Sequence, residues 1–215
     1  MCAALQVEWL GRVSFEDALA RQEALLARKV AEPATPDTLL LLEHEPVYTI
    51  GRTPDQSSLR DPENLPHPLV KTSRGGQATY HGPGQLIGYP VLDLRERGRD
   101  LHCYLRDLEE LVIAVLQEHG IAGIRREALT GVWVGSRKIA SIGVGVRHWV
   151  TMHGFALNVG KDLSAFDHIT PCGIAGVAMT AMEQELGHAV LLSQVAETVR
   201  QLAPAYLIAA GRGVG

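Results

Sequence analysis

The stretch that decides the fold class runs from Gly131 to Val159 and reads GVWVGSRKIASIGVGVRHWVTMHGFALNV. Its first two extended runs are separated by Gly135-Ser136, a dipeptide typical of a hairpin turn. A third apolar run begins at Val150, soon after the second run ends. Strands joined by such short connections pair in an antiparallel manner. The stretch therefore predicts the antiparallel part of a β-sheet.

The segments on either side add helices and further strands. Ser14, with Asp17 three residues later, fits the N-cap of a first amphipathic helix, and Gly120 fits the stop of a second. The expected helices cover residues 14–32, 101–119, 178–187 and 191–203, and the expected outer strands cover residues 5–11, 39–51 (interrupted by Pro46) and 86–94. We therefore expect a single domain over residues 1–215, of class α/β, with a mixed, largely antiparallel sheet and flanking helices.

The composition excludes several functional classes. Of the 215 residues 46% are hydrophobic and 20% are charged, as in an ordinary globular protein. The net charge of −4 argues against a nucleic-acid partner, which usually needs a basic surface. We also expect no membrane association, because no apolar run is long enough to span a bilayer and the N-terminus does not resemble a signal peptide. Three cysteines without a C-x-x-C pair predict a reduced, cytoplasmic protein.

Nucleotide and metal motifs are missing from the sequence. The pattern G-x-x-x-x-G-K-[ST] does not occur, and GVGVRH ends in His148 where a dinucleotide fingerprint needs glycine. His153, His168 and Cys172 lack the spacing of a zinc site. We therefore expect no metal and no cofactor.

A dense glycine cluster, RGGQATYHGPGQ, runs from Arg74 to Gln85. Glycine allows positive φ and lets a ligand approach the backbone closely, and the interleaved Arg, Tyr, His and Gln offer directional donors and acceptors. The segment is either a surface turn between two strands or a binding loop, and the density of these residues favours the binding loop. His81 within it either orients a substrate, assists proton transfer, or closes the loop through hydrogen bonds. His148 and His153 are expected at strand ends.

Cys172 and Lys138 are the candidates for nucleophilic chemistry. Pro171 and Gly173 flank the cysteine and indicate a sharply shaped turn that presents a side chain, although a free cysteine is more often a small buried residue. A lysine at the start of a strand usually extends its ammonium to water. If Lys138 were instead enclosed beside a thiol, it would favour the thiolate and exchange a proton with it. The local sequence leaves both interpretations open.

Three blocks in this order resemble one family closely: RGGQATYHGPGQLIGYP, then GVWVGSRKIASIGVGVRHWVTMHGFALNV, then HITPCGIAG. They look like the octanoyltransferases of lipoate biosynthesis (lipoyl/octanoyl transferases, LipB), and the resemblance covers nearly the whole chain. It implies an acyltransferase that needs no cofactor. It also implies an α/β fold similar to the catalytic domains of lipoate and biotin protein ligases.

The resemblance assigns roles to individual residues. In that family the cysteine of the PCG block carries the acyl group as a thioester, and the lysine of the RKIA block is its acid–base partner. These positions correspond to Cys172 and Lys138. The residues implied to line the acyl and pantetheine site are Arg74, Gly75, Gly76, Gln77, Ala78, Thr79, Tyr80, His81, Ser141, Ile142, Gly143, Gly154, Phe155 and Ala156.

The implied reaction moves an octanoyl group from octanoyl-acyl carrier protein to a lysine of a lipoyl domain. The implied acceptors are the E2 subunits of 2-oxoacid dehydrogenases and the glycine cleavage H protein. Three alternatives are an ATP-dependent lipoate or biotin protein ligase, a non-catalytic module that binds acyl carriers or lipoyl domains, and a Cys-His hydrolase that uses His81 or His168. A ligase that forms an adenylate would not need Cys172.

Overall fold

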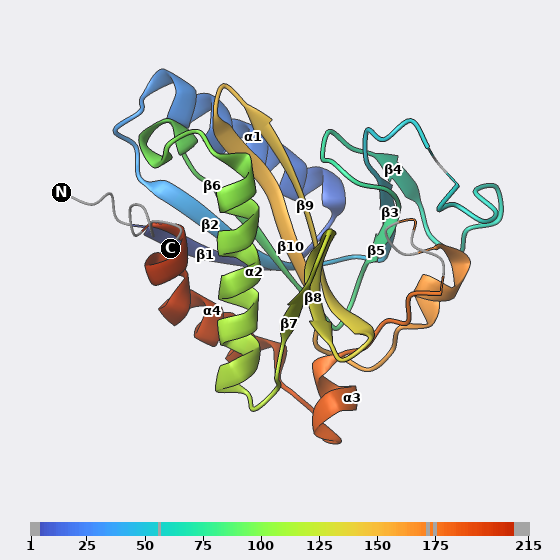
Figure 1. Ribbon diagram of the computed structural model, residues 1–215. Coiled ribbons are helices and arrows are strands. Elements are labelled where there is room, and N and C mark those ends of the chain that lie inside the picture. The colour runs from blue at the N-terminus through green and yellow to red at the C-terminus, as the bar shows by residue number, and fades with distance from the viewer. Residues whose placement is uncertain (1–4, 56, 171–172, 174–175, 209–215) are drawn as a thin grey trace.

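A seven-stranded mixed sheet forms the centre of the protein (Figure 1). The computed structural model describes residues 5–55, 57–170, 173 and 176–208. The strands lie in the order β1-β2-β6-β10-β9-β8-β7, with bounds Leu5–Val13 (β1), Asp37–His44 (β2), Gln85–Val91 (β6), Ile124–Arg126 (β7), Leu129–Val134 (β8), Arg137–Arg147 (β9) and Val150–Asn158 (β10). β1 and β2 are parallel, and the other neighbours are antiparallel. The predicted mixed, largely antiparallel sheet is therefore confirmed.

Helices cover both faces of this sheet. α1 lies against β2, β6 and β10 on one face, and α2 and α4 lie together on the other (Figure 1). The helices and 3-10 turns are Phe15–Ala31 (α1), Leu94–Arg97 (η1), Leu101–Glu118 (α2), Ser164–His168 (η2), Met182–Leu186 (α3) and Leu192–Leu207 (α4). The expected cap of the first helix is confirmed, because the Ser14 side chain accepts a hydrogen bond of 3.0 Å from the Asp17 N–H.

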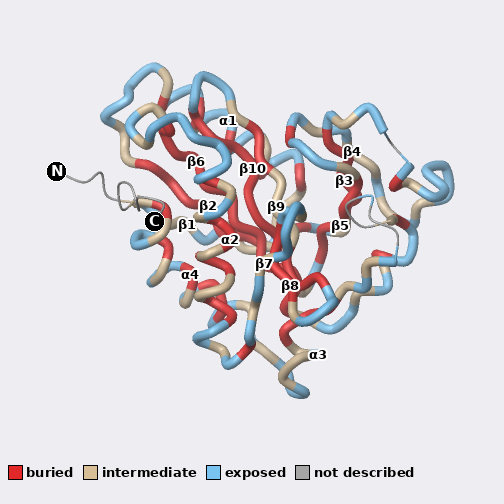
Figure 2. The backbone as a smooth tube through the Cα atoms, viewed as in Figure 1, coloured by how far each residue is buried: buried red, intermediate tan, exposed pale blue. Residues whose placement is uncertain are grey.

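The central strands are apolar on both sides because both sides are covered. In β2, Leu39 and Leu41 belong to the core beneath α2 and α4, whereas Leu40 and Leu42 belong to the core beneath α1. This alternation follows from the two-residue period of a strand. Figure 2 shows the result as buried strands running through the middle of the molecule.

A second, three-stranded sheet corrects one expectation. Its order is β4-β3-β5, with bounds Val47–Ile50 (β3), Leu69–Lys71 (β4) and Thr79–His81 (β5). The run 39–51, expected as one interrupted strand, is two strands in different sheets. The break falls at Pro46, which has no N–H to donate to a strand ladder.

Two further features differ from the expectations. β7 was not expected, because its three residues are too short to show a period. His153 lies in the middle of β10, paired with Val144, and not at a strand end, with φ at +57°. Among the helices that the structure describes, none has the length and apolar character needed to cross a membrane.

Candidate active site

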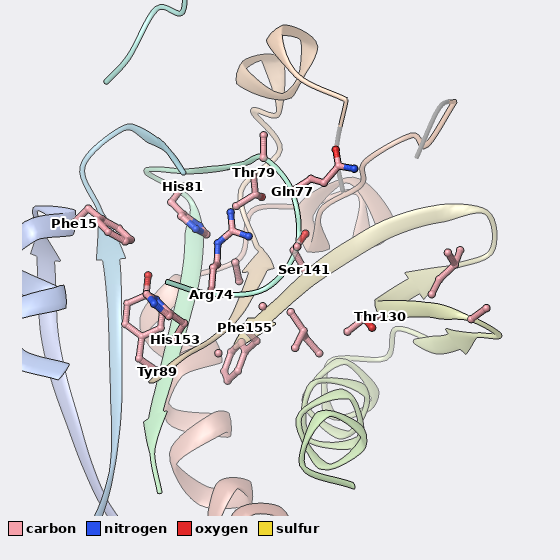
Figure 3. A pocket seen from close by; sticks show the side chains of 18 residues that line it. Phe15, Arg74, Gln77, Thr79, His81, Tyr89, Thr130, Ser141, His153 and Phe155 are labelled. Atoms are coloured by element: carbon pink, nitrogen blue, oxygen red, sulfur yellow. The ribbon is translucent and has the colours of Figure 1, made fainter. Parts of the chain in front are cut away.

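A cavity of about 320 Å³ lies where the glycine segment meets β9 and β10 (Figure 3). Most of the residues expected to bind substrate lie on its wall: Arg74, Gly76, Gln77, Ala78, Thr79, His81, Ser141, Ile142, Gly143, Gly154, Phe155 and Ala156. Two of them lie elsewhere. The Gly75 N–H donates to the Val144 carbonyl, and the Tyr80 ring packs between Tyr48, His67 and Phe166. The structure thus brings together three segments that are far apart in the sequence.

Lys138 is buried beside this cavity, with only 1% of its surface exposed. Its Nζ donates to the carbonyl of Thr130 at 2.9 Å and lies 5.5 Å from the centre of the Trp133 ring. Thr130 itself lines the cavity. A lysine at the start of a strand normally extends its ammonium to solvent, but Lys138 does not. A buried amine that bonds a residue of the cavity wall is a candidate for proton exchange with a group bound there.

Cys172 lies outside the described residues, but the positions around it are tied to the cavity wall. The Thr170 N–H donates to the Ser58 carbonyl at 2.7 Å, and the Gly173 N–H donates to the Thr170 carbonyl at 2.9 Å. Gly173 has φ at +69°, and a Cβ there would collide with the side chain of Gln77. The left-handed backbone conformation favours glycine at this position, and a larger residue would also displace the end of the Gln77 side chain.

Arg74 lines the cavity, and its guanidinium is held by hydrogen bonds. Its Nη2 donates to the carbonyl and the hydroxyl of Thr49, and its Nη1 donates to the carbonyl of Gly75. A Cβ on Gly143, which lines the cavity, would lie 3.2 Å from Cδ of Arg74. The methylene stem of Arg74 therefore contributes apolar surface to the wall, while its guanidinium is held by β3 and the glycine segment.

A chain of hydrogen-bonded buried amides determines which ring nitrogen of His81 carries the proton. Asn158 Nδ2 donates to the Thr180 carbonyl, so its oxygen accepts from Gln85 Nε2. The oxygen of Gln85 must then accept from His81 Nδ1, at 2.7 Å. His81 carries its proton on Nδ1, and burial keeps its pKa well below the ordinary value.

Three more aromatic side chains close one end of the cavity, and the sequence had not singled them out for this role. Phe15, Tyr89 and His153 lie together on the side of Arg74 opposite Thr130 (Figure 3). Tyr89 bonds His44 through its hydroxyl at 2.8 Å, and His44 stands behind the wall. Burial lowers the pKa of His44 and of His153 to about 4, so both rings are neutral at neutral pH.

These contacts have no local sequence signal. Phe15 follows a helix cap and Tyr89 lies in a buried strand, so each reads as an ordinary core residue. The remaining lining residues that were not expected, Ala128, Leu129 and Thr130, come from the β7–β8 turn and the start of β8. Within the described part of the chain, no group of His, Cys, Asp and Glu side chains is arranged to hold a metal ion.

Comparison with known proteins identifies the family. The model of the lipoyl protein ligase A/B catalytic domain family matches residues 14–202. An octanoyltransferase of Geobacter metallireducens is 53% identical over 195 residues, which are 91% of this chain and 90% of that protein. An octanoyltransferase of Syntrophotalea carbinolica is 51% identical over 191 residues, 89% of each chain. The chain belongs to the octanoyltransferase family.

Solved structures show that the octanoyltransferase chain shares its fold with ligases. A lipoate-protein ligase A crystallised with ATP has a TM-score of 0.69 at 15% identity, with 96% of this chain and 86% of that chain covered. The biotin protein ligase from Aquifex aeolicus has a TM-score of 0.54 at 17% identity, with 94% and 68% covered. The expected similarity to lipoate and biotin protein ligase catalytic domains is therefore confirmed.

Proposed function

We propose that this protein transfers an octanoyl group from octanoyl-acyl carrier protein to a lysine of a lipoyl domain, through a thioester on Cys172. The observation that carries the proposal is the buried Lys138 amine, which is bonded to a residue of the cavity wall. Relatives with about half of their residues identical are octanoyltransferases. The cavity supplies a place for the acyl chain, and Lys138 supplies the proton exchange that thioester chemistry needs.

In the first half-reaction, the Cys172 thiolate attacks the thioester carbonyl of the donor. A tetrahedral intermediate forms and collapses with cleavage of the bond to the pantetheine sulfur. The departing thiolate takes a proton from the Lys138 ammonium, which becomes the neutral amine. The octanoyl group is then bound to Cys172 as a thioester.

In the second half-reaction, the amine of the acceptor lysine attacks the enzyme thioester. The new amide bond forms as the bond to the Cys172 sulfur breaks. Lys138, left neutral by the first step, takes the proton that the attacking nitrogen releases, and the enzyme returns to its starting state. The acyl group is already activated as a thioester in both steps, first on the carrier protein and then on Cys172. The proposed mechanism therefore uses no ATP, cofactor or metal.

The proposal extends to the setting of the reaction. The acceptors are the lipoyl domains of E2 subunits of 2-oxoacid dehydrogenases and the glycine cleavage H protein. Residues 1–215 work as a single domain, in the cytoplasm, without a nucleic-acid or membrane partner. The Cys-His hydrolase alternative has less support, because burial keeps the pKa of His81 well below its ordinary value and so makes it a weak base, and because His168 is exposed and does not line the cavity.

The test is the intact mass of the enzyme after incubation with octanoyl-acyl carrier protein. The wild type should gain one octanoyl group, Cys172→Ser should gain none, and the adduct should disappear when a lipoyl domain is added. An adduct that persists in Cys172→Ser would show that the thioester on Cys172 is wrong, and transfer of free octanoate that requires ATP would establish the ligase alternative. Binding of both partners without any acyl transfer would instead establish a binding module, and release of free octanoate at a rate comparable to transfer would establish a hydrolase.

A further inference from the structure

The cavity has two chemically different ends. At one end the wall residue Thr130 bonds Lys138, and Gln77 contacts Gly173, next to Cys172. At the other end lie Phe15, Tyr89 and His153, on the far side of Arg74 in Figure 3. We call these the reactive end and the closed end. If the acyl carbon is bonded to Cys172 at the reactive end, the alkyl chain extends towards the closed end.

The closed end suits an alkyl chain because its polar side chains use their polar atoms elsewhere. Tyr89 donates its hydroxyl proton to Nε2 of His44, since Nδ1 of His44 is occupied by the Val13 carbonyl. Nε2 of His153 is hydrogen-bonded to Ser73 Oγ at 3.3 Å, and the Arg74 guanidinium bonds Thr49. The wall at this end therefore includes the rings of Phe15, Tyr89 and His153 and the methylene stem of Arg74. A surface made mostly of rings and methylene groups favours a hydrocarbon chain.

Phe15 is held firmly in this wall. It is the first residue of α1, directly after the Ser14 cap, and it is 3% exposed. Its ring stacks on His153 with 6.5 Å between centres and an interplanar angle of 10°, and it lies 5.4 Å from the His44 ring. Gln22, which lies in the same helix, accepts a 2.7 Å hydrogen bond from the His153 N–H. The helix and the strand are thus fastened together at the point where Phe15 enters the cavity.

We infer that Phe15 closes the acyl site and sets the longest acyl chain that the enzyme accepts. This inference rests on the proposed octanoyl transfer and names the residue that determines its chain-length specificity. A longer chain needs the volume that the Phe15 ring occupies, and the rings of His44 and His153 lie against that ring at 5.4 Å and 6.5 Å between centres. A single methylene that does not fit an apolar pocket changes kcat/KM by about 10- to 200-fold.

The experiment measures kcat/KM for transfer to a lipoyl domain from hexanoyl-, octanoyl-, decanoyl- and dodecanoyl-acyl carrier protein. Phe15→Ala should raise the ratio of decanoyl to octanoyl transfer by about tenfold or more. Phe15→Trp should lower the ratio of octanoyl to hexanoyl transfer by a similar factor, because its larger ring shortens the cavity. Phe15→Leu removes less volume and keeps the test available if the alanine variant does not fold.

Two control variants separate this effect from general damage. Leu26→Ala truncates a buried side chain of the same helix that packs against Val91, Val150 and Met152, away from the cavity. It should leave every ratio unchanged. Leu129→Ala enlarges the cavity on the Thr130 side, and it should also leave the ratios unchanged.

The outcomes distinguish the inference from the function on which it rests. Unchanged ratios in folded Phe15→Leu and Phe15→Trp would overturn the inference while leaving octanoyl transfer intact. A shift caused by Leu129→Ala but not by the Phe15 variants would overturn it as well, and would place the chain at the opposite end. If the wild type transfers none of the four acyl groups, the proposed function itself is wrong.

Discussion

The reactive end and the closed end of the cavity hold ionisable side chains that are equally buried but have different hydrogen-bond and ring partners. Lys138 and His153 are 1% and 2% exposed. At the reactive end, the Lys138 amine donates to a carbonyl and lies over the face of the Trp133 ring. At the closed end, burial holds His44 and His153 neutral. The contrast indicates that burial alone does not determine what a polar group does, and that the partners supplied with it do.

The largest effect should come from removing the titratable group of the reactive end. Lys138→Met keeps most of the apolar stem and removes the amine, so both proton transfers lose their partner. General acid–base catalysis is worth about 10²- to 10⁴-fold, and transfer should fall by that factor. Stopped-flow measurement of each half-reaction checks this, with binding of the acyl carrier as the control. A decrease of less than tenfold, in a variant that still binds the donor, would remove Lys138 from the mechanism.

The fold was more predictable from the sequence than the cavity was. Hairpins such as Gly135-Ser136 and caps such as Ser14 are local signals, and the strands and helices that they delimit are present. The cavity wall depends on pairing across the sheet, which brings Tyr89 in β6 and His153 in β10 into contact. Phe15 is the clearest example of what the sequence could not predict, because nothing near it in the sequence distinguishes a residue that lines a cavity from one that lies in the core.

Lys138 and Cys172, the candidate catalytic pair, also differ in how much of their setting the sequence predicts. The resemblance of the RKIA block picked out Lys138, but its burial depends on Trp133 in β8 and on the Ala178 carbonyl, to which the Lys138 N–H donates. The local pattern alone left open whether this lysine reaches water or is enclosed. Cys172 stays a prediction, because it lies outside the described residues.

The second largest effect is a pH dependence of stability, which follows from the neutral histidines of the closed end. Burial lowers the pKa of His44 and His153 from 6.5 to about 4. Between these values the unfolded chain binds more protons than the folded protein, so the free energy of unfolding falls as the pH falls. From pH 7 to pH 5 the loss should be about 2 kcal/mol per histidine. Urea unfolding across this range measures it.

A double variant provides the control for this pH dependence. His44→Phe with Tyr89→Phe removes one titrating ring together with its hydrogen-bond partner, so that no buried hydroxyl is left without an acceptor. The decrease between pH 7 and pH 5 should become about 2 kcal/mol smaller than in the wild type. An identical pH dependence in both proteins would show that His44 is not held neutral by the fold.

The smallest effect should come from Gln22, which holds the closed end in shape. Its side-chain oxygen accepts from the His153 N–H, and its nitrogen donates to the Ala18 carbonyl at 3.3 Å. His153 is kept at φ +57°, a conformation that costs a non-glycine residue about 1–2 kcal/mol. Gln22→Met leaves the buried His153 N–H unpaired, so stability should fall by about 1–3 kcal/mol.

The consequence for the two ends is what makes this substitution informative. If Gln22 acts only at the closed end, Gln22→Met should weaken the discrimination between octanoyl and decanoyl donors while thioester formation with octanoyl stays within a few-fold of wild type. Gln184→Met, an exposed amide that donates to the Lys161 carbonyl, is the matched control and should alter neither property. Chain-length discrimination and half-reaction rates are measured on the same preparations. Equal loss of both in Gln22→Met would mean that the two ends are mechanically coupled, because a single buried amide would then position Lys138 as well as the ring of His153.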